Sequence, residues 1–398
     1  MALAVSPFSL GVRTTAADHL RKHSSGSPTP IKSKPIINKS SSYDIVSRSN
    51  NSTFNSNRPK VVCSFRSLSN EQPRRSYSIQ ACTEAGAPIE DSPLLKKVWD
   101  FGHVWLKYLR PYAIVGTVAA SVSVYGRVMT ENPDLFRWSL LMKALPGLFA
   151  IICGNAYYIG INQIYDVDID RVNKPYLPIA SGELSMKSAW LLAIFYLVAG
   201  LLIVGLNAEP LVTGLYCLAL FFGTIYSVPP LRLKRFSIST ALVLSSIRGV
   251  LINIGVYYAT RKTTLGLTFM WSPALVFITT FITLLFMVVA ITKDITDIEG
   301  DTKFQIVTFA AKFGVRNIAL FGTGILLLNY IGAILVPICM PQAFNRNFMV
   351  STHAILALWL LLQAWILEQG KYTKEACANF YQVIWKLLYA EYIIYPFI

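Results

Sequence analysis

The pattern of apolar and polar positions divides the chain into a polar N-terminal extension and a long apolar remainder. A transmembrane helix needs about 20 mostly apolar residues, and runs of that length recur from residue 112 to residue 397. They predict about nine membrane-spanning helices, at residues 112–129, 139–163, 188–206, 211–228, 238–260, 272–292, 316–336, 349–367 and 378–397. The pattern therefore predicts an all-α, polytopic membrane domain over residues 111–398.

Two segments precede this domain. Residues 82–110 are expected to form a linker and then a helix that lies at the membrane surface. Within residues 94–110, tryptophan and phenylalanine alternate with lysine, a pattern typical of an interfacial amphipathic helix. Pro111 then turns the chain towards the membrane interior.

Residues 1–81 have the composition of a targeting segment. Residues 1–75 contain twelve Lys or Arg against three acidic residues, and no long apolar run is present. A secretory signal needs such a run, so the composition predicts an organellar transit peptide within a disordered extension, with cleavage near Ala81. Its hydroxyl-rich character favours a plastid over a mitochondrion, and a disordered regulatory tail is the alternative.

Three carboxylates follow directly on an apolar run, in the stretch NQIYDVDID at residues 162–170. The chain has 21 acidic residues against 36 basic ones, so this cluster stands out. Carboxylates beside hydrocarbon are costly and commonly mark function. A second stretch, KDITDIEGD at residues 293–301, superposes on the first at a constant offset of 131 residues (297 − 166), so that Asp166 aligns with Asp297 and Asp170 with Asp301.

Both acidic stretches are expected on the same side of the membrane, because each follows an even-numbered span. The basic loop YSVPPLRLKR, residues 226–235, also follows an even-numbered span. Lys and Arg are more frequent in these even loops than in the odd ones, which by the positive-inside rule makes this the cytoplasm-equivalent face. In a plastid that face is the stroma.

The residue types predict a magnesium and diphosphate site. At a helix end, Asn162, Asp166 and Asp170 fall at i, i+4 and i+8, and hence on one face. Carboxylates without His or Cys suit Mg²⁺, which also binds substrate phosphates. The six cysteines have no metal-ligand spacing. The predicted metal ligands are Asp166, Asp170, Asp294, Asp297 and Asp301, and the predicted diphosphate contacts are Asn162, Arg171, Lys174, Arg232, Lys234 and Lys303.

Acids, magnesium and a basic rim that face an apolar interior indicate a substrate with a diphosphate head and a hydrocarbon tail, an isoprenyl diphosphate. Metal ions and cations would stabilise the departing diphosphate, with Asp166, Asp170, Asp297 and Asp301 as the catalytic acids. The allyl cation would lie in a water-poor cavity near aromatic faces. Candidate cavity residues are Tyr157, Tyr158, Tyr226, Tyr257 and Arg248, the last inside the fifth span.

Other classes of function stay open at this point. The acidic stretches could be solvated loops, or could bind calcium without catalysis, although they lack the ligand order of an EF-hand. A transporter is the rival class, but its acids would lie near mid-span rather than at helix ends. No basic, aromatic-interleaved groove is evident, so nucleic acid is not an expected partner. In the last span, Lys386 and Glu391 could pair with each other or extend to the interface.

The stretches NQIYDVDID and KDITDIEGD, with YSVPPLRLKR between them, resemble the UbiA superfamily of intramembrane aromatic prenyltransferases. NQIYDVDIDRVNKPYLPIASGELS is similar to its plant plastid homogentisate branch, and other stretches are similar to the homogentisate solanesyltransferase type. The resemblance implies a nine-helix bundle around a central, lipid-accessible cavity. It also implies Mg²⁺-diphosphate binding by both acidic stretches, with Lys174, Arg232 and Lys234 at the diphosphate.

The chain departs from the solanesyltransferase pattern in the loop after the second acidic stretch. Thr296 stands in place of a proline and Thr302 in place of an arginine, and further changes fall at Val307, Phe309, Ala311 and Phe313. Asp168 stands where that type has a small residue. The diphosphate residues are intact, so these changes are expected to alter the acceptor and the length of the prenyl donor.

Together these features predict a Mg²⁺-dependent aromatic C-prenyltransferase of a plastid membrane, in contact with membrane lipid. The expected donor is dimethylallyl diphosphate, or geranyl diphosphate, and the expected acceptor is a phenolic compound such as a flavonoid, chalcone or coumarin. The alternative is a homogentisate solanesyltransferase of plastoquinone synthesis.

Overall fold

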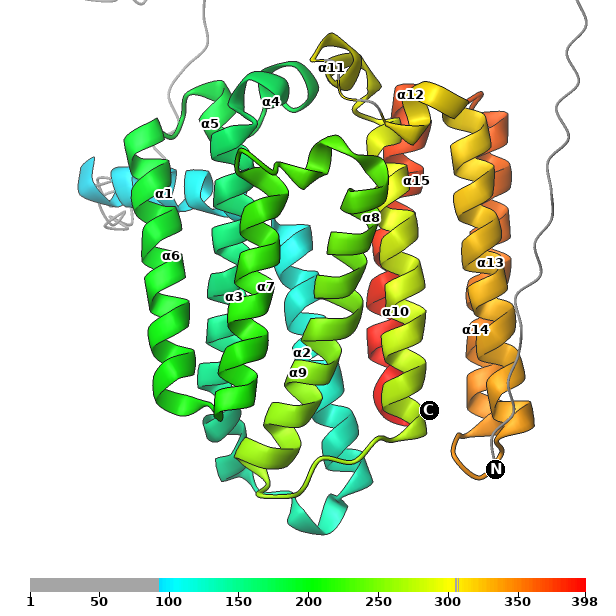
Figure 1. Ribbon diagram of the computed structural model, residues 1–398. Coiled ribbons are helices and arrows are strands. Elements are labelled where there is room, and N and C mark those ends of the chain that lie inside the picture. The colour runs from blue at the N-terminus through cyan, green and yellow to red at the C-terminus, as the bar shows by residue number, and fades with distance from the viewer. Residues whose placement is uncertain (1–92, 305, 307) are drawn as a thin grey trace, which may run out of the picture. The chain divides into compact units, whose positions relative to one another are not determined.

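The computed structural model describes residues 93–398 apart from positions 305 and 307. The predicted transit peptide, its cleavage site near Ala81, most of the linker and Val307 lie outside these residues. Within the described part of the chain every regular element is a helix, and the long helices run side by side as a bundle (Figure 1).

Eight stretches of the described chain are long and apolar enough to span a membrane. They are α2 (Pro111–Glu131), α3 (Trp138–Tyr165), α6 (Met186–Asn207), α7 (Pro210–Ser227), the continuous stretch Ser237–Thr264, α10 (Pro273–Thr292) extended to Ile295, α13 (Val315–Cys339) and α14 (Arg346–Gln369). The ninth predicted span is α15 (Lys374–Ile394), which at 21 residues is also long enough but carries Lys374, Glu375, Lys386 and Glu391. The predicted all-α membrane fold is confirmed.

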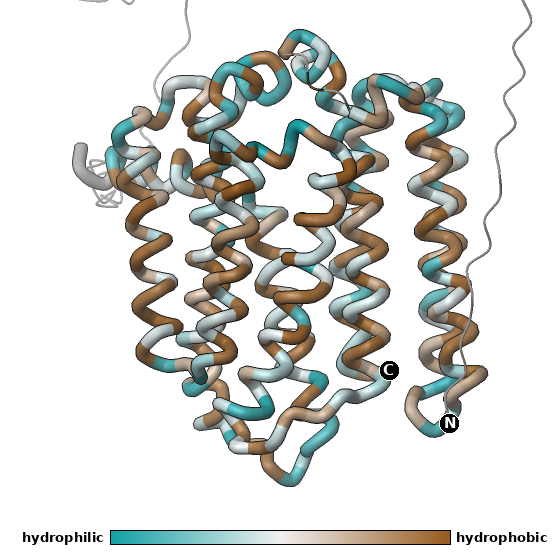
Figure 2. Tube along the Cα trace, in the orientation of Figure 1, coloured by the Kyte–Doolittle hydropathy of each residue, from teal (hydrophilic) through white to brown (hydrophobic). Residues whose placement is uncertain are grey.

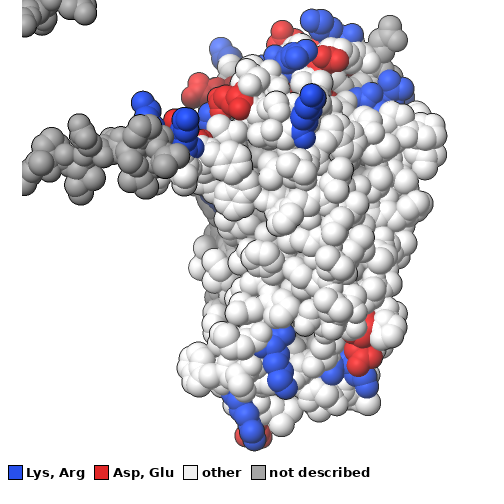
Figure 3. Space-filling model, turned by 90° about the vertical axis from the view of Figure 1, so that its left-hand side faces the viewer, with Lys and Arg blue, Asp and Glu red and all other residues white. Residues whose placement is uncertain are grey.

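The distribution of polar residues agrees with a membrane-spanning bundle. Apolar residues occupy the middle of the helices, and polar ones gather at both ends (Figure 2). On the face in Figure 3, the Lys, Arg, Asp and Glu side chains form an upper and a lower group with an uncharged belt between them. A belt of this kind matches the hydrocarbon core of a bilayer, which excludes charge.

The stretch Ser237–Thr264 is not a uniform α-helix. It consists of α8 (Ser237–Ser245), a π-helical segment η3 (Ser246–Leu251), α9 (Ile252–Ala259) and a second π-helical segment η4 (Thr260–Thr264). Single π turns inside helices are frequent at functional sites, because the extra residue redirects a side chain. Arg248 lies in η3.

Helix α1 (Pro93–Leu109) runs across the bundle rather than along it (Figure 1). Its outer face exposes Val98 and Trp99, whereas Tyr108 and Leu109 are buried. Tyr108 lies so close to Gly160 of α3 that a Cβ at this glycine would overlap the tyrosine hydroxyl. This contact fixes the C-terminal end of α1, and therefore the following residue Arg110, against α3.

The last helix corrects one expectation. Lys386 and Glu391 do not pair, because residues five apart in a helix lie on different faces. Lys386 is exposed, while the fully buried Glu391 accepts a contact from His353 Nε2 of α14 at 3.1 Å. The His353 Nδ1 lies 2.6 Å from the carbonyl oxygen of Met349.

Candidate active site

Both acidic stretches lie at the same end of the bundle, where short helices follow α3 and α10 (Figure 1). Helix α3 ends at Tyr165, and Asp166 separates it from α4 (Val167–Asn173). Asn162 and Asp170 therefore lie in two successive helices, and Asp166 lies at the turn between them. The helical i to i+4 hydrogen bonds nevertheless continue across this turn: Asp166 N donates to Asn162 O at 3.0 Å, and Asp170 N donates to Asp166 O at 2.7 Å.

The second stretch repeats this geometry. After α10, the 3₁₀ segment η5 (Lys293–Ile295) leads to Asp297, and α11 (Ile298–Lys303) begins directly behind it. Asp166 has φ −110° and ψ 11°, and Asp297 has φ −105° and ψ 4°. Asp301 N donates to Asp297 O at 3.0 Å, as Asp170 N does to Asp166 O. The alignment found at an offset of 131 residues (297 − 166) therefore corresponds to two matching turns of backbone.

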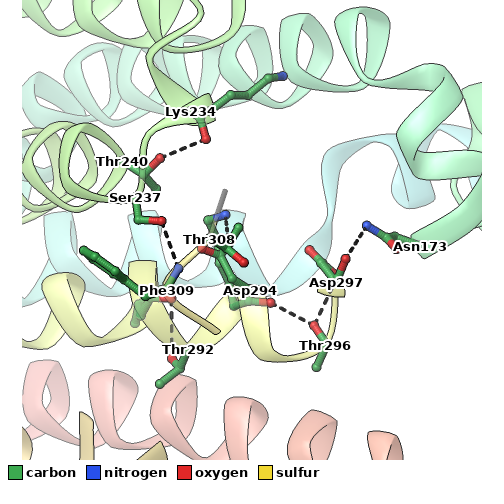
Figure 4. Close-up of polar contacts among 12 residues, drawn as sticks. Asn173, Lys234, Ser237, Thr240, Thr292, Asp294, Thr296, Asp297, Thr308 and Phe309 are labelled. Atoms are coloured by element: carbon green, nitrogen blue, oxygen red, sulfur yellow. Dashed lines mark hydrogen bonds and ion pairs between the residues drawn. The ribbon is translucent and has the colours of Figure 1, made fainter. Parts of the chain in front are cut away.

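Polar contacts join the two stretches across the end of the bundle. The Lys174 Nζ lies 2.5 Å from Asp297 Oδ2, and Asn173 Nδ2 donates to the Asp297 carbonyl oxygen at 3.0 Å. Figure 4 shows Asn173 pointing towards Asp297 from the opposite side of the site. The two acidic stretches, more than a hundred residues apart in sequence, thus form one cluster.

Most carboxylates of the cluster contact a cation. Asp166 Oδ1 lies 3.0 Å from Arg232 Nη2 and 2.5 Å from Lys234 Nζ, and Asp294 Oδ1 lies 2.5 Å from Lys293 Nζ. The basic loop 226–235 therefore reaches the first acidic stretch, as its place after an even-numbered span predicts. The cluster has cations and carboxylates interleaved in a mostly buried setting.

Arg110 also belongs to this cluster. The sequence predicts it as part of the amphipathic surface helix and does not predict it as a site residue. Its guanidinium lies 3.6 Å from Asp170 Oδ2, a buried oxygen without a hydrogen-bond partner. Arg110 and Arg232 have φ of 49° and 37°, in the left-handed region that non-glycine residues rarely adopt. Strained backbone of this kind is frequent at functional sites, and here it directs two arginines at two carboxylates.

Burial shifts the protonation of several of these groups. Burial raises the pKa of Asp170 to about 6, with the Arg110 charge acting in the opposite direction, and raises the pKa of Asp301 to about 7. Burial lowers the pKa of Lys234 to about 8, although Asp166 opposes that change. For Asp297, burial acts upward but Lys174 outweighs it, so its pKa is lowered. Asp170 and Asp301 are thus carboxylates whose negative charge the protein compensates poorly.

These residues fit a hard divalent cation by donor type. Buried carboxylate oxygens are the ligands Mg²⁺ prefers, and an additional positive charge would favour the ionised forms of Asp170 and Asp301. Among the described residues no three His, Cys, Asp or Glu side chains converge on one point as a preassembled metal centre. The carboxylates contact lysine and arginine instead, so any metal site here would form together with an anionic ligand.

Two predicted diphosphate contacts lie apart from the buried cluster. Arg171 pairs with Asp168 at 2.9 Å on the exposed surface of α4. Lys303 is exposed at the end of α11. The remaining predicted residues, Asn162, Lys174, Arg232 and Lys234, lie within the cluster or contact its carboxylates, and Asn162 Nδ2 donates to Asp166 Oδ2 at 2.9 Å.

A cavity of about 430 Å³ lies among α2, α3, α6, α7 and the stretch from η3 to η4. Most of its lining side chains are apolar, and its polar ones include Thr117, Asn155 and Arg248. Asn155 and Asn162 are seven residues apart in α3, which at 1.5 Å per residue is about 10 Å. Tyr158 lies between them in sequence and lines the cavity. One end of the cavity therefore lies about two helical turns or less from the acidic cluster, and the cavity extends from there towards the opposite end of the bundle.

The other candidate tyrosines have different surroundings. The hydroxyl of Tyr157 lies 2.9 Å from Thr224 Oγ1, between α3 and α7. Tyr226 has Lys293 and Asp294 as charged neighbours. Tyr257 is buried in the core, and its hydroxyl donates to Glu131 at the opposite end of the bundle. Of the four predicted tyrosines, Tyr158 is the one in the lining of this cavity.

The positions at which this chain differs from the solanesyltransferase pattern do not line the cavity, as far as the structure describes them. Thr302 and Phe313 are exposed, and Phe313 packs on Phe309 with ring centroids 6.1 Å apart. Thr296 does contact the cluster, since its hydroxyl donates to Asp297 Oδ1 at 3.1 Å and to Lys293 O at 2.9 Å. A proline at this position could make neither hydrogen bond.

Solved structures share the fold. A digeranylgeranylglyceryl phosphate synthase covers 74% of this chain with 19% identity and a TM-score of 0.52. A UbiA homolog from Archaeoglobus fulgidus, bound to GPP and Mg²⁺, covers 72% of this chain and 99% of its own, with 19% identity and a TM-score of 0.50. At such identities the similarity concerns the fold.

Plant proteins are far more similar in sequence. The "Probable homogentisate phytyltransferase 2, chloroplastic" of Oryza sativa subsp. japonica is 53% identical over 81% of this chain and 85% of its own length. The "Homogentisate solanesyltransferase, chloroplastic" of Arabidopsis thaliana is 52% identical over 81% and 84%. The "2-acylphloroglucinol 4-prenyltransferase" of Humulus lupulus is 49% identical over 79% and 77%.

The pattern described as "UbiA prenyltransferase family" matches residues 118–387, from the middle of α2 to α15. This range contains both acidic stretches, the basic loop and every residue of the cavity lining except Thr117. The prediction of a membrane prenyltransferase is confirmed, and the chain belongs to the UbiA prenyltransferase family.

Proposed function

We propose that this enzyme transfers a short prenyl group from its diphosphate to a ring carbon of a phenolic acceptor, with Mg²⁺ as cofactor. The observation that carries the proposal is the single cluster made by the two acidic stretches, joined by Lys174 and Asp297 at 2.5 Å near an apolar cavity. A charged head group fits the cluster, and a hydrocarbon tail with an aromatic ring fits the cavity.

The cluster supplies ligands for metal and diphosphate together. Asn162, Asp166 and Asp170 on one side, and Asp294, Asp297 and Asp301 on the other, would hold Mg²⁺. When bound, Mg²⁺ would neutralise charge on the diphosphate oxygens. Lys174, Arg232 and Lys234 already contact the carboxylates and would donate to those oxygens, and Arg110 is a further cation within the cluster.

The reaction requires one bond to break and one to form. The allylic C–O bond breaks and its electron pair leaves with the diphosphate, where the cations of the cluster stabilise it. A ring carbon ortho to a phenol attacks the allyl group, and the ring then loses its proton to restore aromaticity. The apolar lining of the cavity keeps water from the allyl cation, and the face of Tyr158 could stabilise it.

The relatives bear on the identity of the donor and the acceptor. The 49% identical relative is named for prenylating a 2-acylphloroglucinol, which supports a phenolic acceptor. The two relatives of higher identity are named for homogentisate, and this favours the alternative, a homogentisate prenyltransferase with a long donor. We favour a flavonoid, chalcone, coumarin or similar acceptor, with dimethylallyl diphosphate as the donor, because the phloroglucinol relative is nearly as similar to this chain as the homogentisate relatives are.

We also propose a plastid membrane as its location. The N-terminal composition has the character of a transit peptide, and two of the relatives described above are named chloroplastic. The cluster would then face the stroma, in line with the excess of Lys and Arg on that side of the bundle. Fractionation of plastids that express a tagged chain tests this assignment.

A panel assay tests the function. Membranes that contain the enzyme receive dimethylallyl, geranyl or solanesyl diphosphate with either homogentisate or a phenolic panel, with Mg²⁺ or with a chelator. We expect a prenylated phenol from dimethylallyl or geranyl diphosphate when Mg²⁺ is present, and no product when the chelator is added. A product from solanesyl diphosphate and homogentisate would establish the alternative, and no product from any pair would refute both.

A further inference from the structure

Arg248 is a cation in the middle of a membrane-spanning stretch, within the π-helical segment η3. Its Nη1 donates to Thr117 Oγ1 of α2 at 2.5 Å, and its Nη2 donates to Asn155 Oδ1 of α3 at 2.7 Å. The guanidinium also lies over the ring of Phe286 in α10, at 5.9 Å from the centroid. Three neighbouring helices therefore fix its position.

All of these partners are neutral. No carboxylate among the described residues lies within 4.0 Å of the Arg248 guanidinium, in contrast to Arg127, which pairs with Glu131 at 3.1 Å. A charge within a membrane is costly unless an opposite charge balances it. The protein thus holds a positive charge rigidly in an apolar region and leaves it without a counter-ion of its own.

The same residue lines the cavity, together with Thr117 and Asn155. The Asn155 amide is oriented by its own bonds to Ala113 O at 3.1 Å and Thr117 Oγ1 at 2.9 Å, so its oxygen is directed to Arg248. A guanidinium has five N–H groups, and two of them make these side-chain bonds. The others remain for a ligand in the cavity.

The position suits an aromatic acceptor. Asn155 and Asn162 lie two turns apart on α3, about 10 Å along the axis, with Tyr158 between them on the same face. Asn162 belongs to the acidic cluster, where the donor's diphosphate would bind. On α3 the cavity lining runs from Leu141 to Tyr158, so Asn155 and Arg248 lie towards the end of the cavity that is nearest to the cluster. An aromatic ring held at Arg248 would therefore lie at the end of the cavity that faces the donor's diphosphate.

We propose that Arg248, positioned by Asn155 and Thr117, binds an anionic oxygen of the acceptor. This inference rests on the proposed function and names a feature of its acceptor, an oxyanion on the side of the ring away from the donor. The oxyanion is either a carboxylate or an ionised phenol. The donor's diphosphate is a poorer candidate, because Lys174, Arg232 and Lys234 already surround the acidic cluster.

Steady-state kinetics of the full-length enzyme test the proposal with Arg248→Gln and Arg248→Lys. The probes are homogentisate (2,5-dihydroxyphenylacetate), its methyl ester and a 2-acylphloroglucinol. For the acceptor that wild type prenylates, Arg248→Gln should raise the acceptor KM at least tenfold and change the donor KM less than twofold. Arg248→Lys, which keeps the charge, should recover part of the loss. An unchanged acceptor KM in Arg248→Gln would overturn the proposal.

The acid and its ester identify the source of the charge. If a carboxylate binds Arg248, wild type should bind the ester at least tenfold more weakly than the acid, and Arg248→Gln should remove that difference. If a phenolate binds, wild type should treat acid and ester alike, and Arg248→Gln should weaken both. Equal binding of every probe by wild type and Arg248→Gln would contradict both versions.

Binding of the same probes, followed by thermal shift of purified enzyme, separates this inference from the proposed function. Wild type without any turnover but with Arg248-dependent binding would refute the function and retain the oxyanion site. Arg127→Gln is the matched control, because it removes another membrane arginine outside the cavity. Arg127→Gln should lower the melting temperature without raising the acceptor KM. If Arg248 had only a structural role, Arg248→Gln would give this same result, and the proposal would be contradicted.

Discussion

The amide oxygen of Asn173 accepts a hydrogen bond from the backbone N–H of Gly300 at 2.9 Å. Because the same amide donates to the carbonyl of Asp297, Asn173 ties α4, which includes the end of the first acidic stretch, to α11, which includes the end of the second. Asn173→Ala removes both bonds. At about 1 kcal/mol each, their loss should lower kcat/KM for the donor roughly tenfold or more.

Asn317→Ala is the control for that change. Asn317 is exposed and bonds only locally, to Phe313 O at 2.9 Å. This variant should keep wild-type kcat/KM. Equal activities of Asn173→Ala and wild type would mean that the contact between the two stretches has no part in positioning Asp297.

Gly300→Ala should disturb the same contact from the other side. An added Cβ would come within 2.5 Å of the Asn173 amide oxygen, so the side chain or α11 must move. The two changes act on one contact, so the double variant Asn173→Ala with Gly300→Ala should lose less activity than the product of the single losses. Strictly multiplicative losses in a double-mutant cycle would show that the two residues act independently.

Lys174→Met should weaken donor binding. Lys174 lies 2.5 Å from Asp297 and holds the pKa of that carboxyl below its ordinary value. Without the lysine the pKa of Asp297 rises, and a charge-assisted contact to diphosphate is lost as well. Such contacts contribute about 1.5–3 kcal/mol, so the KM for the prenyl diphosphate should rise by about tenfold or more. An unchanged donor KM would remove Lys174 from the diphosphate site.

Thr296→Val tests the departure nearest to the cluster. The threonine hydroxyl bonds to Asp297 and to the Lys293 carbonyl, and valine has nearly the same shape without the hydroxyl. The hydroxyl has a single proton that these two acceptors share, so its loss costs about one hydrogen bond, about 1 kcal/mol, and should reduce kcat about fivefold. The ratio of rates with different acceptors should not change, because Thr296 does not line the cavity. An altered acceptor ratio would support the loop as the specificity element instead.

The pair of His353 and Glu391 should govern stability rather than activity. Both side chains are fully buried, and the second carboxylate oxygen of Glu391 has no hydrogen-bond partner. His353→Leu would leave an unpaired buried acid and should cost about 3–5 kcal/mol of the free energy of unfolding. Adding Glu391→Leu should restore most of it, as measured by thermal melting. A double variant no more stable than the single one would contradict this.

The spans and the acidic cluster follow from the sequence because hydrophobic runs and charge are local signals. An offset of 131 residues (297 − 166) aligns Asp166 with Asp297, and these residues have nearly the same backbone torsions. The break at Asp166 and the left-handed Arg110 do not follow, because both arise from packing of α1 and α4 on the bundle. Glu391 pairs with His353 from another helix, a tertiary contact that spacing within α15 cannot indicate.

The measurement that tests the central claim most directly compares Asp166→Asn with Asp168→Asn. Both acids belong to the same stretch, but Asp166 contacts Arg232 and Lys234 in the cluster, while Asp168 is exposed and pairs with Arg171. In membranes supplied with dimethylallyl diphosphate, Mg²⁺ and a phenolic acceptor, Asp166→Asn should lower prenylated product at least a hundredfold. Asp168→Asn should remain within about threefold of wild type, as expected for an exposed ion pair. Full activity of Asp166→Asn, or equal losses in both variants, would contradict a diphosphate site built from the two acidic stretches.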